Sequence, residues 1–402
     1  MQLDKIINMH IGIASPISIQ KFIPYLYTQS ADIAINIQGL KAPAVDTLAI
    51  GLLNAGHQIS IYTLSYEIVK PIILHGERLS IFINPLRVKG WKRAFSFFKI
   101  ESNYIKENIK SENPKPDVLH AHWTYEYALG VIPFKDEIPV FVTVRDWAPT
   151  ILKLTLNYYR FFRLIINNYI FKQKNVNFIA NSKYIAQKIK KRWKKDAFYI
   201  PNPINEEYIN TKSQQTQVRK YLISVSNNLG KGKNIEKLLM AFSQVKLDFP
   251  NLRMILVGIP FTENNHQIKK WTELGLMGNT VLKGSVEHTQ LINLYDQSVI
   301  MVHPSVEESF GNTIIEGMSR KVAVIGGQNS GAVPFLLQNG KNGILTDVKD
   351  VNSIKDSIEY LLMNELKRNI IIENAYQFVK NNFSQDLIIN KTIDLYETKK
   401  NE

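Results

Sequence analysis

Residues 303–318 read HPSVEESFGNTIIEGM and hold two carboxylates in a pattern that indicates a ligand site. Glu308 and Glu316 are separated by seven residues, with a turn of small residues between them and a helix predicted to begin near Asn312. If Glu308 ends the loop and Glu316 lies in the helix, both carboxylates can face one ligand. Backbone N–H groups of residues 311–313 would then point at an anion. This pattern suits a nucleotide diphosphate sugar, with its phosphates in the middle and hydroxyl groups at both ends.

On both sides of this stretch, buried runs typical of strands alternate with helical patterns, which indicates parallel α/β sheets. A helical stripe over 43–55 follows the first predicted strand and the loop that contains Gly39, and Gly56 ends it. The order strand, loop, helix, strand predicts a Rossmann-like sheet. The predicted strands are 6–13, 58–64, 80–83, 117–120, 140–144 and 177–180 in the first half, and 221–226, 253–257, 280–283, 299–303, 323–325 and 343–345 in the second.

Residues 199–204, YIPNPI, are predicted to link two domains, because two prolines around one Asn fit neither a helix nor a central strand. We therefore expect an N-terminal Rossmann-like domain over 1–200 on the acceptor side and a second one over 201–380 on the donor side, facing each other across a ligand cleft. The last segment, 381–402, is predicted to form a helix that crosses back to the N-terminal domain.

Composition excludes several classes of protein. The 402 residues are 45% hydrophobic and 21% charged, which is ordinary for a globular chain and excludes wholesale disorder and a coiled coil. The chain has no Cys, so disulfides, thiolate metal sites and a Cys nucleophile are excluded. No run approaches the roughly 20 apolar residues that a membrane-spanning helix needs. We expect a cytoplasmic protein that can associate with the inner face of the cell membrane.

Positive charge is concentrated in one window. The formal net charge is +14, and residues 151–200, with nine Lys and three Arg against Asp196, contribute +11 of it. Aromatic residues accompany these cations, at 158–162 and at Trp193. Such a mixture suits docking on an anionic membrane surface. Two alternatives stay open, namely a solvated helix face whose apolar residues belong to the core and, less favoured, a nucleic-acid surface.

The sequence resembles the retaining glycosyltransferases of family 4, which have the two-domain GT-B fold. Residues 303–318 resemble the family's E-x7-E motif, and further segments resemble its other conserved stretches. The resemblance implies a hexosyltransferase that moves a sugar from a nucleotide diphosphate sugar to a glycan or lipid-linked acceptor in cell-surface polysaccharide synthesis. A phosphorylase or an epimerase acting on a nucleotide sugar is the alternative. The further segments are 199–203, 233–242, 281–295 and 324–334, and more weakly 56–58 and 116–122.

Glycosyl transfer from a nucleotide diphosphate develops positive charge at the anomeric carbon and negative charge on the departing diphosphate. The sequence has no Asp-x-Asp to hold a divalent metal, so no metal and no cofactor are expected, and Lys233, with Lys231, is the available counter-charge. A solvated loop is the alternative for both lysines. The family usually has an Arg where Asn228 stands, so either Lys231 replaces that charge or the diphosphate is held less tightly.

The resemblance also assigns roles around the carboxylate pair. Glu308 would lie under the donor sugar and offset its developing positive charge, and Glu316 would contact the ribose. A solvent-facing carboxylate is the alternative for Glu316, although its mostly apolar helix argues against it. The remaining predicted donor-binding residues are Ser309, Phe310, Gly311, Asn312 and Thr313.

In the first domain, His122 and Asp146 are the predicted catalytic-site residues. His120 and His122 follow one strand on the same side of the chain, which could suggest a metal site, but no third ligand is evident. Arg145 stands where many family members have a His over the donor sugar, and it cannot be a general base at neutral pH, so a phosphate or acceptor contact is predicted. An Arg145–Asp146 structural pair is the alternative. Gly39 would allow close approach to the donor or acceptor, or serve turn geometry alone.

Overall fold

The computed structural model describes residues 8–211 and 221–402, and residues 6 and 7 of the first predicted strand lie outside these ranges. The chain forms two compact units. The N-terminal domain comprises the residues up to Pro203 together with Gln385–Glu402, and the C-terminal domain comprises Ile204–Ser384. No helix in the described ranges is both long enough and apolar enough to cross a lipid bilayer.

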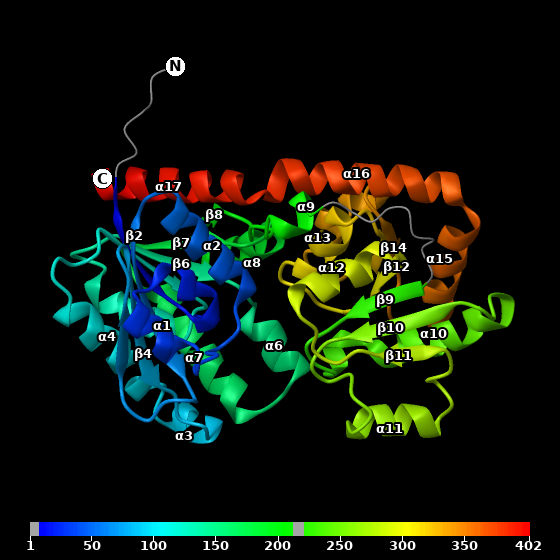
Figure 1. The fold of residues 1–402 in the computed structure, drawn as a ribbon, viewed down its shortest axis with the longest axis horizontal. Coiled ribbons are helices and arrows are strands. Elements are labelled where there is room, and N and C mark those ends of the chain that lie inside the picture. The colour runs from blue at the N-terminus through cyan, green and yellow to red at the C-terminus, as the bar shows by residue number, and fades with distance from the viewer. Residues whose placement is uncertain (1–7, 212–220) are drawn as a thin grey trace, which may run out of the picture. The chain divides into compact units, whose positions relative to one another are not determined.

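The N-terminal domain is built on a sheet in the order β3-β4-β2-β1-β5-β6-β7-β8. Figure 1 labels β2, β4, β6, β7 and β8 of this sheet. All neighbours pair in parallel except β3, which is antiparallel to β4 at the edge. The order reverses direction between β1 and β5, so the carboxyl ends of these strands form the point where doubly wound sheets bind ligands. The strands are β1 His10–Ala14, β2 Gln58–Ser65, β3 Ile72–His75, β4 Leu79–Pro85, β5 Val118–His122, β6 Val140–Val144, β7 Val176–Ala180 and β8 Phe198–Tyr199.

Helices cover both faces of this sheet and bury one apolar cluster on each side. One cluster is closed by η1, α1, α2 and α17, and the other by α4, α5, α7 and α8. The helices are η1 Ile19–Tyr25, α1 Thr28–Ala34, α2 Pro43–Asn54, α3 Gly90–Phe95, α4 Lys99–Ser111, α5 Glu126–Val131, η2 Ile132–Phe134, α6 Ala148–Leu154, α7 Tyr158–Lys172, α8 Lys183–Trp193 and α17 Gln385–Asn401.

The C-terminal helix α17 belongs to the N-terminal domain and packs closely on α2. A Cβ on Gly51 of α2 would lie 1.8 Å from Cδ1 of Ile389, so glycine is required where the two helices approach. The hydroxyl of Tyr396 hydrogen-bonds Nδ1 of His120 at 2.5 Å, and this tyrosine is fully buried. Residues at the far end of the chain therefore complete the core under β5 and β6.

The C-terminal domain is built on a fully parallel sheet in the order β11-β10-β9-β12-β13-β14, which is the Rossmann order with its switch point between β9 and β12. Its strands are β9 Tyr221–Val225, β10 Arg253–Val257, β11 Thr280–Leu282, β12 Ser298–His303, β13 Ala323–Gly327 and β14 Ile344–Thr346. Its helices are α9 Glu207–Asn210, η3 Lys231–Lys233, α10 Ile235–Asp248, α11 His266–Glu273, α12 His288–Asp296, α13 Asn312–Ser319, α14 Val333–Leu336, η4 Gln338–Gly340, α15 Val351–Met363 and α16 Glu365–Phe383.

Candidate functional site

The switch point of the C-terminal domain brings together the loops after β9 and β12. The loop after β9 leads into η3, which carries Lys233, and β12 ends at His303, five residues before Glu308. The backbone N–H of Val306 donates to the carbonyl of Gly232 at 2.9 Å and ties the two loops together. A charged cluster predicted from separate motifs therefore forms at the end of the sheet where parallel α/β domains bind ligands.

Glu308 is held as a carboxylate by two neighbours. Its Oε1 is paired with the Nζ of Lys233 and lies 3.1 Å from Nε2 of His303. Burial works to raise the pKa of Glu308, but the charge of Lys233 and the hydrogen bond from His303 outweigh it and hold the pKa well below its usual range. The side chain of Lys233 is about one quarter exposed, so its ammonium can also meet a ligand. Glu308 therefore carries a negative charge at neutral pH.

The backbone around Glu308 depends on one glycine. The carbonyl of Glu308 accepts from the N–H of Ala332 at 2.9 Å. A Cβ on the preceding Gly331 would lie 2.2 Å from that carbonyl oxygen, and Gly331 has a φ of +62°, which L side chains rarely adopt. Only glycine at this position lets the segment after β13 press against the loop and fix its course.

Helix α13 begins at Asn312, where the sequence predicted it, and Gly311 precedes it with a φ of +102°. Thr313 lies near the charged cluster, because its hydroxyl is 3.4 Å from Nδ1 of His303. Phe310, in contrast, is buried in the core of the domain against Phe383, so its side chain does not face a ligand. Of the predicted donor-binding stretch, Ser309 and Thr313 are half-buried and Asn312 is exposed.

Glu316 faces tyrosines within the domain. Its Oε2 accepts from the hydroxyl of Tyr295 at 3.2 Å, and Tyr208 also bonds it. Burial first, and the charge of Glu316 second, raise the pKa values of both tyrosines. The half-buried carboxylate is thus satisfied by hydroxyl donors, and the alternative of a carboxylate that simply faces solvent is wrong.

Lys231 and Asn228 lie on the exposed side of the loop after β9. The Oδ1 of Asn228 accepts from the N–H of Gly230 at 3.1 Å, and its carbonyl accepts from the hydroxyl of Ser226 at 2.8 Å. Asn228 therefore shapes the loop, while the exposed ammonium of Lys231 is two residues from Lys233. Replacement of the missing arginine charge by Lys231 stays a prediction.

In the N-terminal domain, His120 is a structural residue. Its Nδ1 bonds Tyr396 and its Nε2 lies 2.6 Å from Oγ1 of Thr143, so both ring nitrogens are used. Burial, with the nearby charge of Arg145, lowers its pKa to about 3. The described residues hold no cluster of three or more His, Cys, Asp or Glu that could bind a metal, and His120 has no nitrogen left for one. The rings of His120 and His122 do lie on one side of β5, 4.1 Å apart.

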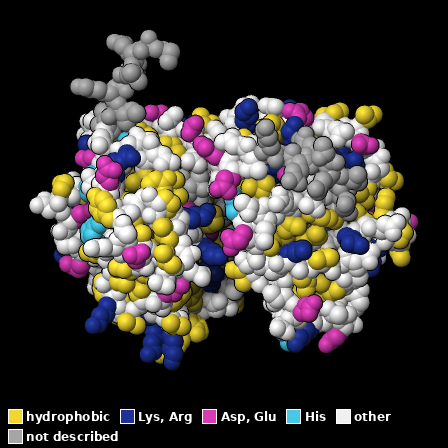
Figure 2. All heavy atoms as spheres, viewed as in Figure 1, with side chains coloured by type: hydrophobic (Ala, Val, Ile, Leu, Met, Phe, Trp, Pro, Cys, Tyr) yellow, Lys and Arg dark blue, Asp and Glu magenta, His cyan; other side chains and the backbone are white. Residues whose placement is uncertain are grey.

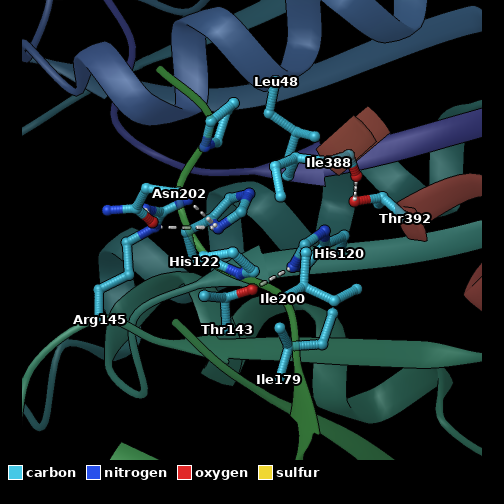
Figure 3. Close-up of a pocket in the computed structure, with 12 residues that line it drawn as sticks. Leu48, His120, His122, Thr143, Arg145, Ile179, Ile200, Asn202, Ile388 and Thr392 are labelled. Carbon is cyan, nitrogen blue, oxygen red and sulfur yellow. Dashed lines mark hydrogen bonds between the residues drawn. The ribbon is translucent and has the colours of Figure 1, made fainter. Parts of the chain in front are cut away.

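His122, a predicted catalytic-site residue, is fully buried in the domain. Figure 3 shows it beside Arg145 and Asn202, and its role in catalysis stays a prediction. Its Nδ1 accepts N–H groups from Arg145 at 3.0 and 3.1 Å, and burial holds its pKa well below the usual value. The neutral ring therefore carries its proton on Nε2, which has no partner within the described ranges. The cavity beside it, about 20 Å³, has room for about one water.

Arg145 bridges His122 and the linker. Its Nη1 donates to Oδ1 of Asn202 at 2.7 Å, and its guanidinium lies over the ring of Trp123. Burial lowers its pKa to about 9, so it stays cationic at neutral pH. The predicted alternative of an Arg145–Asp146 pair is wrong, because Asp146 instead accepts from the hydroxyl of Tyr125 at 2.7 Å, and burial raises its pKa.

Gly39 has a φ of +74°, and a Cβ there would lie 2.6 Å from the carbonyl of Ile17. Its N–H donates to Oε2 of Glu67 at 2.9 Å, and the residue forms an isolated bridge with Ser18. Turn geometry alone therefore accounts for this glycine. A contact with donor or acceptor stays a prediction.

Sequence reasoning missed several residues around these sites. No role was predicted for His303, Asn202 or Tyr125, which contact Glu308, Arg145 and Asp146 respectively. Asn202 was placed in the predicted linker without a role. The prolines on both sides of it were the signal, since they fix an Asn in a backbone that neither a helix nor a strand would hold.

Two family models match the chain. The model described as Glycosyltransferase Family 4 matches residues 44–208, and the model described as Glycosyl transferases group 1 matches residues 208–378. The two matches adjoin and together cover most of the chain. The chain therefore belongs to the family 4 glycosyltransferases and has their GT-B fold, as the resemblance implied.

The curated relatives that the chain resembles include proteins named as glycosyltransferases. The chain is 28% identical over 44% of its length to the capsular polysaccharide biosynthesis glycosyltransferase CapM of Staphylococcus aureus, and this match spans 46% of that protein. It is 24% identical to an uncharacterised glycosyltransferase of Methanocaldococcus jannaschii over 77% of this chain and 82% of the relative. The chain thus spans about half the length of the first relative and most of the second.

Solved structures share the fold over nearly the full chain. Sucrose-phosphate synthase from Thermosynechococcus elongatus superposes with a TM-score of 0.75 at 17% identity, covering 97% of this chain and 99% of that one. The α,α-trehalose 6-phosphate synthase of Burkholderia multivorans gives a TM-score of 0.73 at 12% identity, covering 98% and 99%. At this identity the likeness establishes the two-domain GT-B fold and no substrate.

Proposed function

We propose that this protein is a retaining, metal-independent hexosyltransferase that takes a sugar from a nucleotide diphosphate sugar and adds it to a glycan or lipid-linked acceptor. The observation that carries the proposal is the pairing of Lys233 with Glu308 at the switch point of the C-terminal sheet. One group is a cation that a diphosphate can bind, and the other is a carboxylate that keeps its charge at neutral pH.

The opposite charges of Glu308 and Lys233 give the two residues different roles in the reaction. Departure of the diphosphate leaves positive charge on the sugar, which Glu308 stabilises, while negative charge grows on the phosphate, which Lys233 stabilises. In the absence of a donor the two groups neutralise each other, so a bound diphosphate competes with Glu308 for the ammonium of Lys233. The departing phosphate can itself take the acceptor proton, and the chain then needs no separate general base.

Metal independence is supported by the residue types available. The sequence has no Asp-x-Asp, and the described residues bring no three His, Asp or Glu together. Lys233 and the first turn of α13 supply positive potential where a metal would otherwise sit. A role in cell-surface polysaccharide synthesis is supported by the similarity to CapM, which covers less than half of this chain.

Membrane association is part of the proposal, and an aromatic patch on the N-terminal domain supports it. Helix α3, the residues just after it and the first turns of α7 meet there, since Phe95 stacks on Tyr158 and both Phe95 and Phe97 contact Phe162 edge-on. Figure 2 shows hydrophobic and Lys or Arg side chains together over α3 at the lower edge of the domain. The aromatic patch consists of Trp91, Phe95, Phe97, Tyr158 and Phe161, which are 41–61% exposed.

The patch differs from the window predicted from sequence. Trp193, which was expected to dock, is half-buried and stacks on Phe171 in the domain interior. In its place, tertiary packing brings exposed aromatic residues of 91–97, which lie outside the basic window, next to α7. Amphipathic rings beside cations suit the interface of an anionic bilayer, so the patch would hold the enzyme near a lipid-linked acceptor.

The test is donor turnover with and without the charge of Glu308. The protein is incubated with a panel of nucleotide sugars, and release of nucleoside diphosphate is followed. We expect Glu308→Gln to stay folded and lose about a hundredfold or more in rate, because only the charge is removed. Glu307→Gln, the neighbouring carboxylate, serves as the control that keeps its rate. Full activity of Glu308→Gln, or a product with inverted anomeric configuration by NMR, contradicts the proposal.

A further inference from the structure

A second cavity of about 320 Å³ lies entirely within the N-terminal domain. This volume is at the lower end of what small-molecule sites occupy. Exposed Lys41 and Tyr66 stand at its edge, so it is open to solvent there. Its walls are mostly aromatic and cationic, and the lining residues are Pro16, Leu40, Lys41, Tyr66, Leu86, Arg93, Trp123, Tyr125, Glu126, Tyr127, Tyr159 and Arg163.

Arg93, on α3, is the informative residue of this cavity. Its side chain is 8% exposed, and its Nε has no hydrogen-bond partner. Its one hydrogen bond within the described ranges runs from Nη2 to the hydroxyl of Tyr66 at 3.0 Å, and no described carboxylate pairs with it. A buried arginine is normally neutralised by an acid, since an unpaired buried charge is costly. Arg93 is therefore a buried cation that no acidic side chain of the described residues neutralises.

The aromatic rings arrange the cations around the cavity. The guanidinium of Arg93 lies over Tyr159 at 5.5 Å from the ring centroid, and that of Arg163 lies over the same ring at 4.9 Å. Arg163 also stacks on Tyr125 at 4.2 Å. Stacking of this kind holds both guanidinium planes in place without using their hydrogen-bond donors.

The charges of the lining do not cancel. Arg163 is paired with Glu126 at 3.0 Å, so this pair is neutral. Arg93 and Lys41 have no acidic partner among the described residues, and Glu126 is the one acidic side chain of the lining. The cavity thus offers two positive charges to a ligand, together with walls built largely of aromatic side chains.

We propose that this cavity binds the acceptor through an anionic group, so that the acceptor is a saccharide that carries a phosphate or a carboxylate next to the ring. The anion lies against Arg93 and Lys41, and the sugar ring packs against the aromatic walls of the cavity. A guanidinium fork matches both a phosphate and a carboxylate in a bidentate way. The assignment of the ligand as acceptor rests on the proposed function, whereas the anion site itself does not.

The cavity adjoins the aromatic patch. Helix α3 carries Arg93 toward the cavity and exposes Trp91 and Phe95, and helix α7 carries Tyr159 and exposes Phe161. An anionic saccharide attached to a lipid would therefore find its charged group and its lipid accommodated by the same two helices. A free acidic sugar has the same anionic chemistry and lacks only the lipid.

The experiment is a calorimetric titration of the full chain, without donor, with three probes: glucose 1-phosphate, glucuronate and glucose. Glucose 1-phosphate represents a phosphate-bearing acceptor, and glucuronate represents a uronic acid. We expect an anionic probe to bind at least tenfold more tightly than glucose. We expect Arg93→Gln to abolish that advantage, Lys41→Ala to reduce it, and Arg93→Lys to retain part of it. Lys92→Gln, an exposed cation one residue away on the same helix, is the matched control and should bind like the wild type.

Each result decides the matter. A preference for glucose 1-phosphate or for glucuronate that depends on Arg93 supports the site and identifies the anion. Equal affinity for all three probes overturns the inference, and so does binding that is lost in Lys233→Ala but kept in Arg93→Gln, because the probe would then occupy the C-terminal domain. If Arg93→Gln does not fold, the comparison of Lys41→Ala and Arg93→Lys with the control decides.

The inference and the proposed function fail separately. If the wild type turns over a donor but no probe binding depends on Arg93, the proposal of an anionic acceptor is refuted. The proposed transferase function then still stands. If probe binding depends on Arg93 but the protein turns over no nucleotide sugar, the proposed transferase function is refuted. The cavity is then an anion-binding site whose ligand is not a glycosyl acceptor.

Discussion

Replacing Lys233 by Met should expose how strongly the chain depends on the pair with Glu308. The side chains of Lys233 and Glu308 are 26% and 15% exposed, so the pair is largely but not fully removed from water. Deleting one partner of a fully buried pair costs about 3–5 kcal/mol. Water reaches this pair in part, and we therefore expect Lys233→Met to lower the free energy of unfolding of the C-terminal domain by about 2–3 kcal/mol.

A double-mutant cycle separates this coupling from lost packing. Glu308→Gln leaves an ammonium that can turn to solvent, so we expect that single change to cost about 1 kcal/mol. The double variant Lys233→Met with Glu308→Gln should cost less than the sum, by about 1–2 kcal/mol, because no unpaired charge stays behind. Urea unfolding at neutral pH measures all four proteins, and the exposed Lys231→Met is the control, expected within about 0.5 kcal/mol of wild type. Additive effects of the two changes would refute the pairing.

The pairing of Lys233 with Glu308 should also make the stability difference between wild type and Lys233→Met depend on pH. In the wild type the pKa of Glu308 is held well below its usual value of 4.5, so its stabilisation is complete above that value and is lost as the pH falls through and below it. In Lys233→Met burial prevails, the pKa of Glu308 rises, and protonation relieves the unpaired charge. The difference in stability between wild type and Lys233→Met should therefore shrink from pH 7 to pH 4. A constant difference would show that Glu308 does not respond to Lys233.

Two further predictions concern metals and membranes. Treatment with EDTA should leave sugar transfer intact, since positive potential comes from Lys233 and α13; strict recovery only with added magnesium or manganese would contradict this. The protein should sediment with anionic vesicles, more weakly at high salt, and should lose that binding when Phe95 and Phe161 are changed to Ser. Leu366→Ser on α16, which changes an even more exposed apolar side chain, should leave the binding unchanged. Equal sedimentation of both variants, or equal binding to neutral vesicles, would argue against the aromatic patch as the docking surface.

The sheets were largely predictable because buried parallel strands are nearly continuous apolar runs. The observed strands β2, β6 and β10 agree with the predicted strands 58–64, 140–144 and 253–257 to within about one residue. β3 and β8 were missed for a physical reason. β3 is an antiparallel edge strand with only one fully buried residue, and β8 has two residues, neither of them buried, so neither produces an apolar run.

The site was predictable in its parts and less so in its contacts. Lys233 and Glu308 each follow a strand of a parallel sheet, and position along the chain therefore placed them at one edge. Their mutual pairing depends on how two loops pack. The burial of His122 could not be predicted, because residues far along the sequence, Ile388 and Thr392, line the same small cavity. Arg93 gave no signal, since a lone arginine in an exposed-looking segment is usually solvated.

Because helix α17 packs in the N-terminal domain, this domain cannot complete its core until α17 has been synthesised. The N-terminal domain emerges from the ribosome first, but the residues that fill the space beside Gly51 and bond His120 are made only after the whole C-terminal domain. At about 5–20 residues per second, synthesis of the intervening C-terminal domain takes roughly 10–40 seconds. During that time the apolar surface that α17 later covers stays exposed on the N-terminal domain. The C-terminal domain, whose residues are contiguous, has no such delay. Chaperone dependence of this protein should therefore concentrate on the domain that is translated first and completed last.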